Sequence, residues 1–426
     1  MKVVKFITKF TGYLVYKVFP MPSASSRDSR TWLFASHVGW NHSSNAKSLF
    51  LQLQEAISHK DSDITAIWIA QDRREACKVR TAGFRSYARY SLKGLYHCLT
   101  AGVYIYTEHT SDINRLTSRT AFCVDLWHGV GIKKLYALDP NYFHKYYGFK
   151  KEPSEHSFLD RMKVPLHIYR KPDIILCPSH FQCKTLFAPM FQIPEEQMIL
   201  TGYPRNGMLL WPNAAIRAYA ERYASQDDLT FLDELATRHF DKVYIYMPTW
   251  RIGCKEPVFS MAGIDFRVLE DALAKNNSLF ILKPHNFDEW QFENTSHIVR
   301  LPDVCEIYTV LPYTDCLITD YSSIYSDYLL MNKEIILFPF DRKVYASDSN
   351  ETLDYDTYYP GKKVYTFEAL VNLIRENEDC HLSPEEHKWT MRIYQECHGN
   401  GVDLIQEIRR RHEGFLNARC KGKIWR

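Results

Sequence analysis

The strongest structural signal in this chain is the stretch Asp315-Cys316-Leu317-Ile318-Thr319-Asp320-Tyr321-Ser322-Ser323. Its first part is apolar and of strand length, and residues 324–331, which follow, have the composition of a helix. A strand that leads through Thr, Asp and Ser into a helix is typical of a parallel α/β sheet. The free backbone N–H groups of such a turn, together with the two serine hydroxyls, suit an anion such as a diphosphate. A plain capped helix is the alternative, because Ser and Asp are common N-cap residues.

Further apolar runs of strand length alternate with helical stretches along the chain. The predicted strands are residues 31–36, 64–70, 102–107, 121–127, 173–178, 198–202, 242–247, 278–282, 315–319 and 335–338. Predicted helices include residues 45–59 and 180–190 and a closing helix over 385–412. This alternation predicts two doubly wound parallel sheets in series, and ligands of such sheets bind at the carboxyl ends of the strands.

The length of 426 residues exceeds that of one average domain. We predict five segments: an amphipathic helix over 1–20, a Rossmann-like domain over 30–205, a helical connector over 206–240, a second Rossmann-like domain over 241–400 and a basic C-terminal tail over 401–426.

The first 20 residues combine a lysine face with an apolar face. Lys2, Lys5, Lys9 and Lys17 fall on one side of a helix, opposite Val3, Val4, Ile7, Phe10, Leu14 and Val18. This pattern is typical of an interfacial helix on an anionic bilayer, and also of a helix packed on its own domain. No apolar run reaches the roughly 20 residues of a membrane span.

The overall composition excludes several classes of protein. The net charge of +3 does not create a strong positive field over the whole protein, so it gives no indication of nucleic-acid binding. The 11 cysteines include no CxxC pair, so zinc-ligand spacing and a disulfide framework are not indicated, and a reducing, cytoplasmic compartment fits best.

The segment from Asp125 to Lys134 is the best candidate for catalysis. His128 leaves a predicted strand into a turn that contains Gly129, which allows a ligand to approach the backbone closely. A histidine in this position can take a proton from an alcohol near neutral pH, and Lys133 and Lys134 could hold phosphates. A structural histidine that caps a turn is the alternative.

Polar residues after strands of the second half suggest a diphosphate pocket. Lys283 and His285 offer donors on a Pro-containing turn, and Arg251 offers a planar fork for phosphate oxygens. With Ser322 and Ser323, they could stabilise a nucleotide leaving group without a metal. Surface solvation or salt bridging is the alternative role for Lys283 and Arg251.

Metal and cofactor motifs are weak in this sequence. The two Asp-x-Asp patterns, at residues 61–63 and 354–356, fit plain loop carboxylates better than metal ligands. Patterns for nucleotide-binding P-loops, nucleophilic serines and zinc proteases are absent, so we expect no metal and no cofactor.

Several motifs, in this order along the chain, together resemble the CDP-glycerol glycerophosphotransferase family, the teichoic acid primases and polymerases and related capsule enzymes. They are Trp127-His128-Gly129 with Lys133-Lys134, Gly202-Tyr203-Pro204-Arg205-Asn206, Pro248-Thr249-Trp250-Arg251, Lys283-Pro284-His285, Thr319-Asp320-Tyr321-Ser322-Ser323, Asp327, Asp341, Tyr345 and Pro360-Gly361. The resemblance covers roughly residues 30–400.

The resemblance implies a GT-B fold, with an acceptor-binding domain first and a CDP-donor domain second. It implies transfer of an alditol phosphate from a CDP-alditol to an acceptor hydroxyl, with release of CMP. His128 and His285 are the implied catalytic residues. The implied donor and diphosphate site comprises Thr249, Arg251, Lys283, His285, Thr319, Asp320, Ser322 and Ser323. Gly129, Lys133, Lys134 and Arg205 lie on the acceptor or phosphate side, and Asp327, Asp341 and Tyr345 also match the family.

The implied partners are CDP-glycerol or CDP-ribitol, a lipid-linked saccharide acceptor and a membrane surface, but no nucleic acid. The implied location is the cytoplasmic face of the bacterial cell membrane, as a peripheral protein. Oligomeric state stays open, a homo-oligomer included. A GT-B glycosyltransferase that uses a nucleotide sugar, and a non-catalytic membrane-associated protein that binds polymer, remain alternatives.

Overall fold

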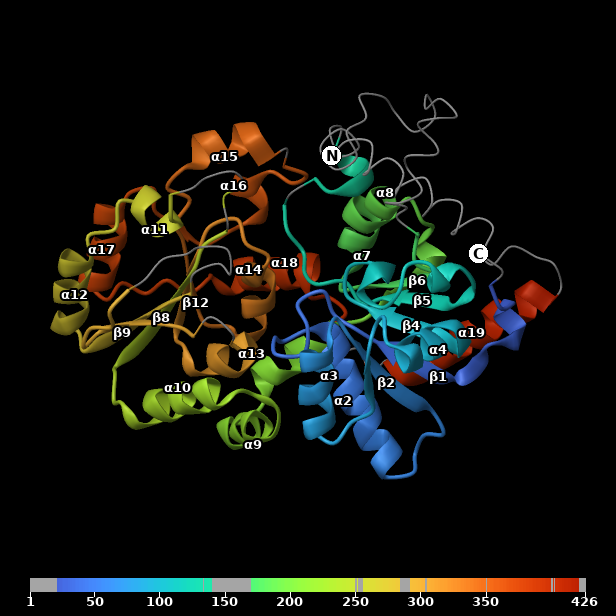
Figure 1. Cartoon of the computed structure of the whole chain (residues 1–426). Coiled ribbons are helices and arrows are strands. Elements are labelled where there is room, and N and C mark those ends of the chain that lie inside the picture. Colours follow the sequence, from blue (N-terminus) through green and yellow to red (C-terminus); the bar gives the residue numbers. More distant parts are fainter. Residues whose placement is uncertain are drawn as a thin grey trace, which may run out of the picture.

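The computed structural model of this chain contains two parallel β-sheets, each flanked by helices (Figure 1). It describes residues 21–132, 134–139, 170–249, 251, 256–283, 292–302, 305–349, 351–399, 401 and 403–420. The helix predicted over residues 1–20 lies outside the described residues. Both sheets confirm the predicted α/β class with two doubly wound units.

The first sheet has seven parallel strands in the order β3-β2-β1-β4-β5-β6-β7. They are β1 (Asp28–Phe34), β2 (Thr65–Ala70), β3 (Ser86–Ala88), β4 (Ala101–Tyr106), β5 (Phe122–Asp125), β6 (Ile174–Cys177) and β7 (Met198–Leu200). Most of these strands are buried on both faces, as their near-continuous apolar sequences predict. The strand order reverses between β1 and β4, which places the ligand-binding switch point there.

Helices cover both faces of this sheet. They are α2 (Asn45–Ser58), α3 (Arg73–Thr81), α4 (Leu92–Thr100), α7 (His180–Gln182), the π-helical η7 (Cys183–Phe187) and α8 (Ala188–Phe191). The first three begin at side-chain caps, because Ser44, Asp72 and Ser91 each accept a backbone N–H from three residues on. Short 3₁₀ turns occur at η1 (Ala24–Ser26), η2 (Thr110–Asp112), η3 (Thr117–Thr120), η4 (Tyr136–Leu138) and η8 (Glu195–Gln197).

The segment after β7 is helical, as the sequence predicts. It contains η9 (Pro204–Leu210), α9 (Asn213–Tyr223) and α10 (Gln226–Thr237). A capping box of Ser225 and Asp228 starts α10.

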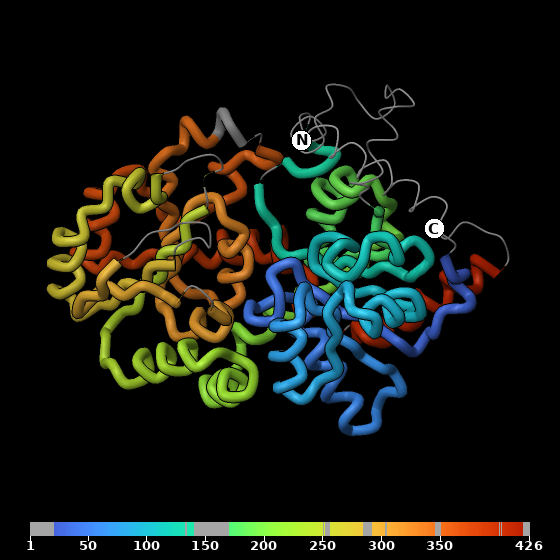
Figure 2. The backbone as a smooth tube through the Cα atoms, in the orientation of Figure 1, coloured from blue at the N-terminus to red at the C-terminus, as the bar shows by residue number. Residues whose placement is uncertain are grey.

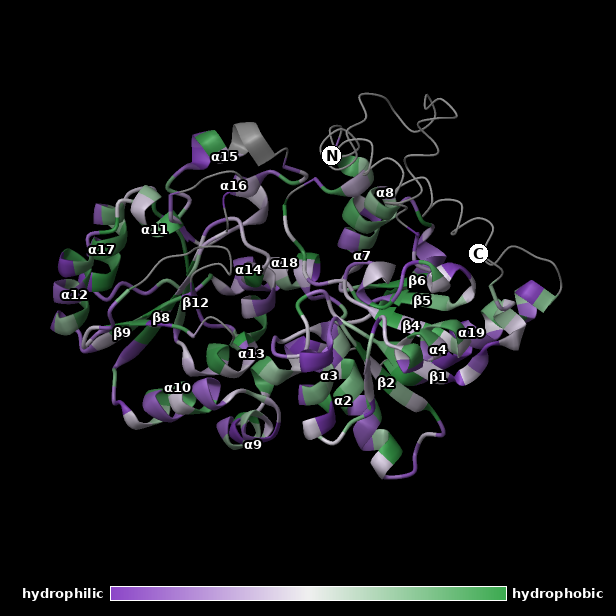
Figure 3. Ribbon diagram, viewed as in Figure 1, coloured by the Kyte–Doolittle hydropathy of each residue, from purple (hydrophilic) through white to green (hydrophobic). Residues whose placement is uncertain are grey.

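The second sheet has six parallel strands in the order β10-β9-β8-β11-β12-β13. They are β8 (Lys242–Met247), β9 (Ser278–Leu282), β10 (Ile298–Arg300), β11 (Cys316–Thr319), β12 (Glu334–Leu337) and β13 (Lys362–Lys363). The helical segments of this part are α11 (Val258–Met261), α12 (Phe266–Lys275), α13 (Ile307–Val310), η10 (Leu311–Tyr313), α14 (Ile324–Tyr328), η11 (Leu329–Met331), α15 (Arg342–Ser349), α16 (Tyr355–Tyr358) and α17 (Phe367–Arg375). Figure 3 shows hydrophobic strands at the centre of both units and mixed helices around them.

The predicted single closing helix over residues 385–412 is wrong. Two helices occupy this region, α18 (Pro384–Tyr394) and α19 (Leu404–Cys420). Gly399 and Gly401 lie between them with φ of +71° and +75°, which is left-handed backbone that ends a helix.

Part of the predicted basic tail is therefore an ordered helix on the first sheet. Phe415 and Ile408 of α19 are buried, and His412 stacks on Phe122 of β5 at 5.3 Å between ring centroids. Figure 2 shows this red segment beside the blue and cyan first half of the chain. In the described ranges, no helix is both long and apolar enough to cross a membrane.

Candidate active site

The two sheets approach each other through the loops that follow β5 and β11. Gly129 of the first loop has φ of +145°, and a Cβ atom placed there would lie 2.9 Å from Oγ of Ser323. The absence of a side chain at Gly129 therefore lets the two loops meet. The structure thus brings together two predicted site residues that are 194 positions apart in the sequence.

His128 is held in a defined orientation at this meeting point. Its Nδ1 lies 3.1 Å from the backbone oxygen of Thr107, at the end of β4. Because a carbonyl oxygen can only accept, Nδ1 carries the ring proton in the neutral form, and Nε2 keeps its lone pair. This tautomer is the one that a general base requires.

Burial keeps the His128 ring neutral. Desolvation, followed by the nearby His37 ring, lowers the pKa of His128 to about 3. Burial and Arg205 lower the pKa of His37 to about 4. An anionic ligand in the cleft would raise both pKa values, because a neighbouring negative charge favours the imidazolium form.

The turn before His128 has an unusual backbone conformation. Trp127 has φ of +52°, a region that residues with a side chain rarely adopt. Its N–H donates to Oδ1 of Asp125 at 2.8 Å, and Nδ2 of Asn45 donates to its carbonyl oxygen at 2.9 Å. The same Asn45 side chain accepts the backbone N–H of Arg205 at 3.3 Å. Asn45 and Asp125 thus fix the loop that presents His128.

Arg205 joins the two domains. Its Nη2 donates to the backbone oxygen of His128 at 2.7 Å and to Oδ2 of Asp327 at 2.9 Å. Asp327 also accepts from the hydroxyl of Tyr308 at 2.5 Å and from Nδ2 of Asn206 at 2.9 Å. The predicted phosphate-side role of Arg205 stays a prediction, since this side chain is buried and occupied by protein partners.

Asp320 organises the second-domain side of the cleft. Its Oδ1 accepts from the backbone N–H and the hydroxyl of Thr249, at 2.8 and 2.6 Å. Its Oδ2 pairs with Nη2 of Arg251 at 2.8 Å, and Nε of Arg251 lies 2.6 Å from Oδ2 of Asp341. Asp320 and Arg251 are both buried. The guanidinium of Arg251 therefore faces two carboxylates in this structure, as the salt-bridge alternative expected, and a phosphate contact stays a prediction.

Aromatic rings complete this cluster. Tyr321 and Tyr345 stack with centroids 3.6 Å apart, and Arg251 lies 5.2 and 5.0 Å from the two ring centres. The hydroxyl of Tyr321 donates to Asp341 at 3.1 Å. The family-matching residues Asp341 and Tyr345 thus hold Arg251 in place. Arg251 in turn pairs with Asp320, which accepts two hydrogen bonds from Thr249.

Among the remaining predicted donor-site residues, one is buried and has a structural role, and the others are partly exposed. Thr319 is buried, and its hydroxyl donates to the backbone oxygen of Met247 at 2.7 Å. Ser322, Ser323 and Lys283 are partly exposed. Lys283 lies close enough to His42 of the first domain to lower the pKa of that histidine, after burial.

Two predicted residues, Lys133 and His285, lie outside the described residues. Lys134 is partly exposed on the loop after Gly131.

In the described part of the chain, the groups of metal-ligand type include none of the predicted site residues. One contains His180, Glu396 and Cys397, and the other contains Glu334, Asp379 and His381. One carboxylate of each Asp-x-Asp pattern has a structural partner: Asp63 pairs with Arg409, and Asp354 caps α16. The expectation of no metal remains a prediction.

Sequence reasoning missed His37, Asn45 and the Lys47–Glu306 ion pair as site residues. His37 lies 5.5 Å from His128 between ring centroids, and the Lys47–Glu306 pair is fully buried. Lys47 lies in the first turn of α2 in the first domain, whereas Glu306 directly precedes α13 in the second domain. No local pattern indicates these pairings, because they form only when the strands are assembled.

Curated relatives of this chain include teichoic acid polymerases. A teichoic acid ribitol-phosphate polymerase of Staphylococcus aureus is 27% identical over 359 residues, which are 82% of this chain and 63% of that protein. The chain thus spans less than two thirds of that relative. A teichoic acid poly(glycerol phosphate) polymerase of Bacillus spizizenii is 25% identical over 394 residues, 88% of this chain and 91% of that protein.

The fold agrees with a solved structure. The wall teichoic acid polymerase TagF matches with a TM-score of 0.67 and 18% sequence identity, over 99% of this chain and 96% of that chain. Residues 18–395 match the family described as CDP-Glycerol:Poly(glycerophosphate) glycerophosphotransferase. This chain, with two doubly wound domains of the GT-B type, therefore belongs to the CDP-glycerol glycerophosphotransferase family.

Proposed function

We propose that this protein transfers an alditol phosphate from CDP-glycerol or CDP-ribitol to a hydroxyl of a lipid-linked saccharide acceptor. The observation that carries the proposal is the orientation of His128, whose Nδ1 faces the Thr107 carbonyl and whose loop meets Ser323. A neutral imidazole with a lone pair on Nε2, at the cleft between two domains, suits proton removal from an alcohol.

The reaction requires one bond to form and one to break. The acceptor oxygen attacks the phosphorus that carries the alditol, and its proton passes to Nε2 of His128. The bond between this phosphorus and the oxygen that bridges to the CMP phosphate breaks, and CMP leaves. Ser322, Ser323 and Lys283 are the partly exposed donors on the second-domain side that could stabilise the departing charge.

The choice of donor is supported by the family and by a related structure. A variant of the TagF polymerase has been solved after a soak with CDPG. Relatives include a ribitol-phosphate primase and a glycerol-phosphate primase of Bacillus. Both CDP-alditols therefore enter the first experiment.

The site of action in this proposal is the cytoplasmic face of the bacterial membrane, with peripheral attachment. The described surface supports it at the start of α4, where Leu92 is 88% exposed beside the exposed side chains of Tyr90, Lys93 and Tyr96. Exposed leucine and tyrosine beside a cation suit a membrane interface. Sedimentation with anionic vesicles tests this part of the proposal, and a Leu92→Ser, Tyr96→Ser variant should bind less.

The deciding experiment measures CMP release by the purified protein with a lipid-linked saccharide extract. CDP-glycerol, CDP-ribitol and UDP-N-acetylglucosamine are supplied separately. CMP from a CDP-alditol supports the proposal and names the donor. UDP release from the sugar nucleotide alone would instead establish a glycosyltransferase.

A further inference from the structure

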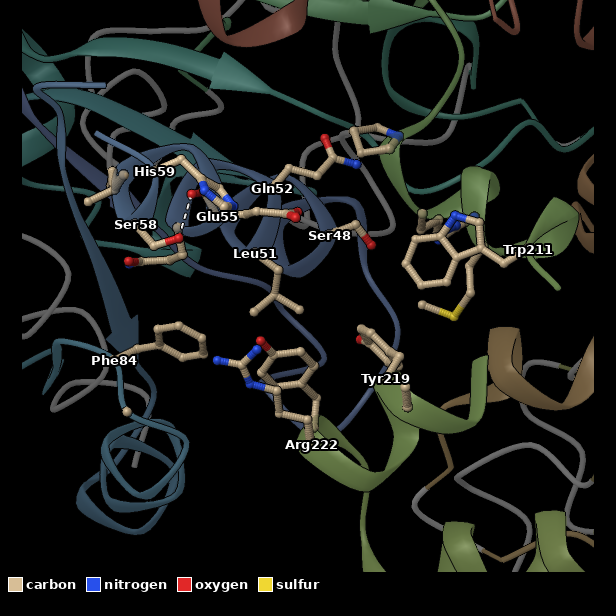
Figure 4. Close-up of a pocket in the computed structure, with 18 residues that line it drawn as sticks. Ser48, Leu51, Gln52, Glu55, Ser58, His59, Phe84, Trp211, Tyr219 and Arg222 are labelled. Carbon is tan, nitrogen blue, oxygen red and sulfur yellow. Dashed lines mark hydrogen bonds between the residues drawn. The ribbon is translucent and has the colours of Figure 1, made fainter. Parts of the chain in front are cut away.

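A groove between α2 and α9 has no role in the mechanism above. Its volume is about 640 Å³, a size typical of small-molecule sites, which range over about 300–1,000 Å³. Figure 4 shows side chains from both helices around one space. Apart from Arg205, its lining contains none of the residues of the candidate active site.

The two helices present complementary side chains to the groove. On α2, the lining residues Ser48, Leu51, Gln52 and Glu55 recur at helical spacing and form one face. This face is largely polar. On the opposite wall, α9 and the preceding turn supply aromatic rings.

These rings form a continuous ladder. Trp211 contacts Tyr219 at 6.0 Å between centroids, Tyr219 contacts Tyr223 at 5.2 Å, and Tyr223 stacks on Phe84 at 5.9 Å. Trp211, at one end of this ladder, is 41% exposed, so its ring is accessible to a ligand in the groove. An aromatic ladder opposite amide, hydroxyl and carboxylate groups can pack against C–H faces while hydrogen-bonding to hydroxyls.

The charges of the groove argue against an anionic ligand. Its lining contains one carboxylate, Glu55, and two guanidinium groups, Arg205 and Arg222. Arg205 is already paired with Asp327, and the formal charge of Arg222 is offset by that of Glu55. Nucleotides and phosphate polymers call for clustered cations instead. An uncharged molecule with ring faces and many hydroxyl groups fits best, and a pyranose saccharide has this chemistry.

The groove adjoins the active site through one residue. Arg205 is part of the groove lining, and its Nη2 donates to the His128 carbonyl at 2.7 Å. Arg205 therefore connects the wall of the groove to the loop that presents the base.

We propose that this groove binds the uncharged saccharide portion of the acceptor, with Trp211 as its main stacking surface. This assignment rests on the proposed transfer to a lipid-linked saccharide. Gln52, Glu55 and Arg222 would hydrogen-bond to the sugar hydroxyl groups.

The first experiment measures binding without any donor. Full-length protein is titrated with di-N-acetylchitobiose by calorimetry and saturation-transfer NMR, and with glycerol 3-phosphate as a charged comparison. Trp211→Ala should weaken disaccharide binding by roughly tenfold, as expected for loss of a central aromatic contact. Trp389→Ala is the matched control, because Trp389 is 37% exposed on α18 and does not line the groove.

The second experiment measures turnover with the lipid-linked saccharide. Trp211→Ala should raise the KM for this acceptor by roughly tenfold and leave the KM for the CDP-alditol unchanged. Unchanged disaccharide binding in Trp211→Ala, equal loss in Trp389→Ala, or an unchanged acceptor KM would each overturn the assignment. If no CDP-alditol yields CMP while disaccharide binding still requires Trp211, the proposed reaction fails and the groove remains a saccharide site.

Discussion

Arg205 and Asp327 form a buried ion pair across the two domains, with Nη2 of Arg205 2.9 Å from Oδ2 of Asp327. The same nitrogen donates to the His128 carbonyl oxygen, so the pair also positions the loop of the candidate base. Tyr308, Asn206 and Gln395 complete the contacts of Asp327.

Removal of the Asp327 charge should therefore destabilise the protein strongly. Asp327→Asn leaves the buried Arg205 guanidinium without its counter-ion, which costs roughly 3–5 kcal/mol in comparable pairs. The measurement is urea unfolding followed by circular dichroism. Glu376→Gln is the control, because Glu376 and its partner Lys275 are exposed and such pairs contribute at most about 1 kcal/mol. An equal unfolding midpoint for Asp327→Asn and the unmodified protein would contradict this role.

His128→Ala should abolish most turnover while donor binding persists. Removal of a general base lowers the rate by roughly 10²- to 10⁴-fold. Calorimetric titration with CDP-glycerol should give an unchanged Kd, since the ring lies on the first-domain side of the cleft. A variant that retains normal CMP release would exclude His128 as the base.

Arg251, which pairs with two carboxylates, could either support the Thr249 loop or bind a phosphate directly, and variants can distinguish these two roles. If Arg251 supports the Thr249 loop through Asp320, then Arg251→Lys and Asp341→Asn should both raise the KM for the CDP-alditol, by roughly tenfold. If it binds phosphate directly, Asp341→Asn should free the guanidinium and leave donor affinity intact or improved. Steady-state kinetics of the two variants therefore decide between the alternatives, and we expect the parallel loss.

The stability of the protein should fall as the pH drops below about 6.5. Burial lowers the pKa of His412 to about 4, and His37 and His128 have similarly lowered pKa values. In the unfolded chain these three histidines take up protons near pH 6.5, whereas in the folded protein they do so only near pH 3 to 4. Each histidine thus stabilises the fold fully above pH 6.5, and this contribution is lost between pH 6.5 and about 4.

His412→Phe tests this dependence without touching the cleft. Phenylalanine keeps the stacking on Phe122 but cannot take up a proton. Between pH 6.5 and 5, the slope of unfolding free energy against pH should decrease by up to about 1.4 kcal/mol per pH unit. An unaltered slope would show that His412 is already protonated in the folded protein or stays neutral in the unfolded chain.

Local sequence predicted the long central strands and the polar motifs at their ends, because apolar runs bounded by such residues carry their own signal. It missed β3, β10 and β13, which have only two or three residues each and depend on the neighbouring strand. The sequence could not predict that His37 and Asn45 lie close to His128 and its loop, since each is more than 80 residues from His128 in the chain. The single closing helix was wrong because Gly399 and Gly401 interrupt a long amphipathic pattern.

The Lys47–Glu306 pair gives the strongest test of coupling between the domains. Both side chains are fully buried, and Ser43 donates a further hydrogen bond to Glu306 at 2.5 Å. Burial raises the pKa of Glu306, while Lys47 opposes this shift.

Lys47→Met alone should cost roughly 3–5 kcal/mol of unfolding free energy, because it leaves the carboxyl group buried without its counter-charge. Lys47→Met combined with Glu306→Leu should recover most of this loss, since apolar replacements of a buried pair are often neutral. Urea unfolding of both single variants and the double variant gives the interaction energy, and simple additivity would show that the two residues do not act as a pair.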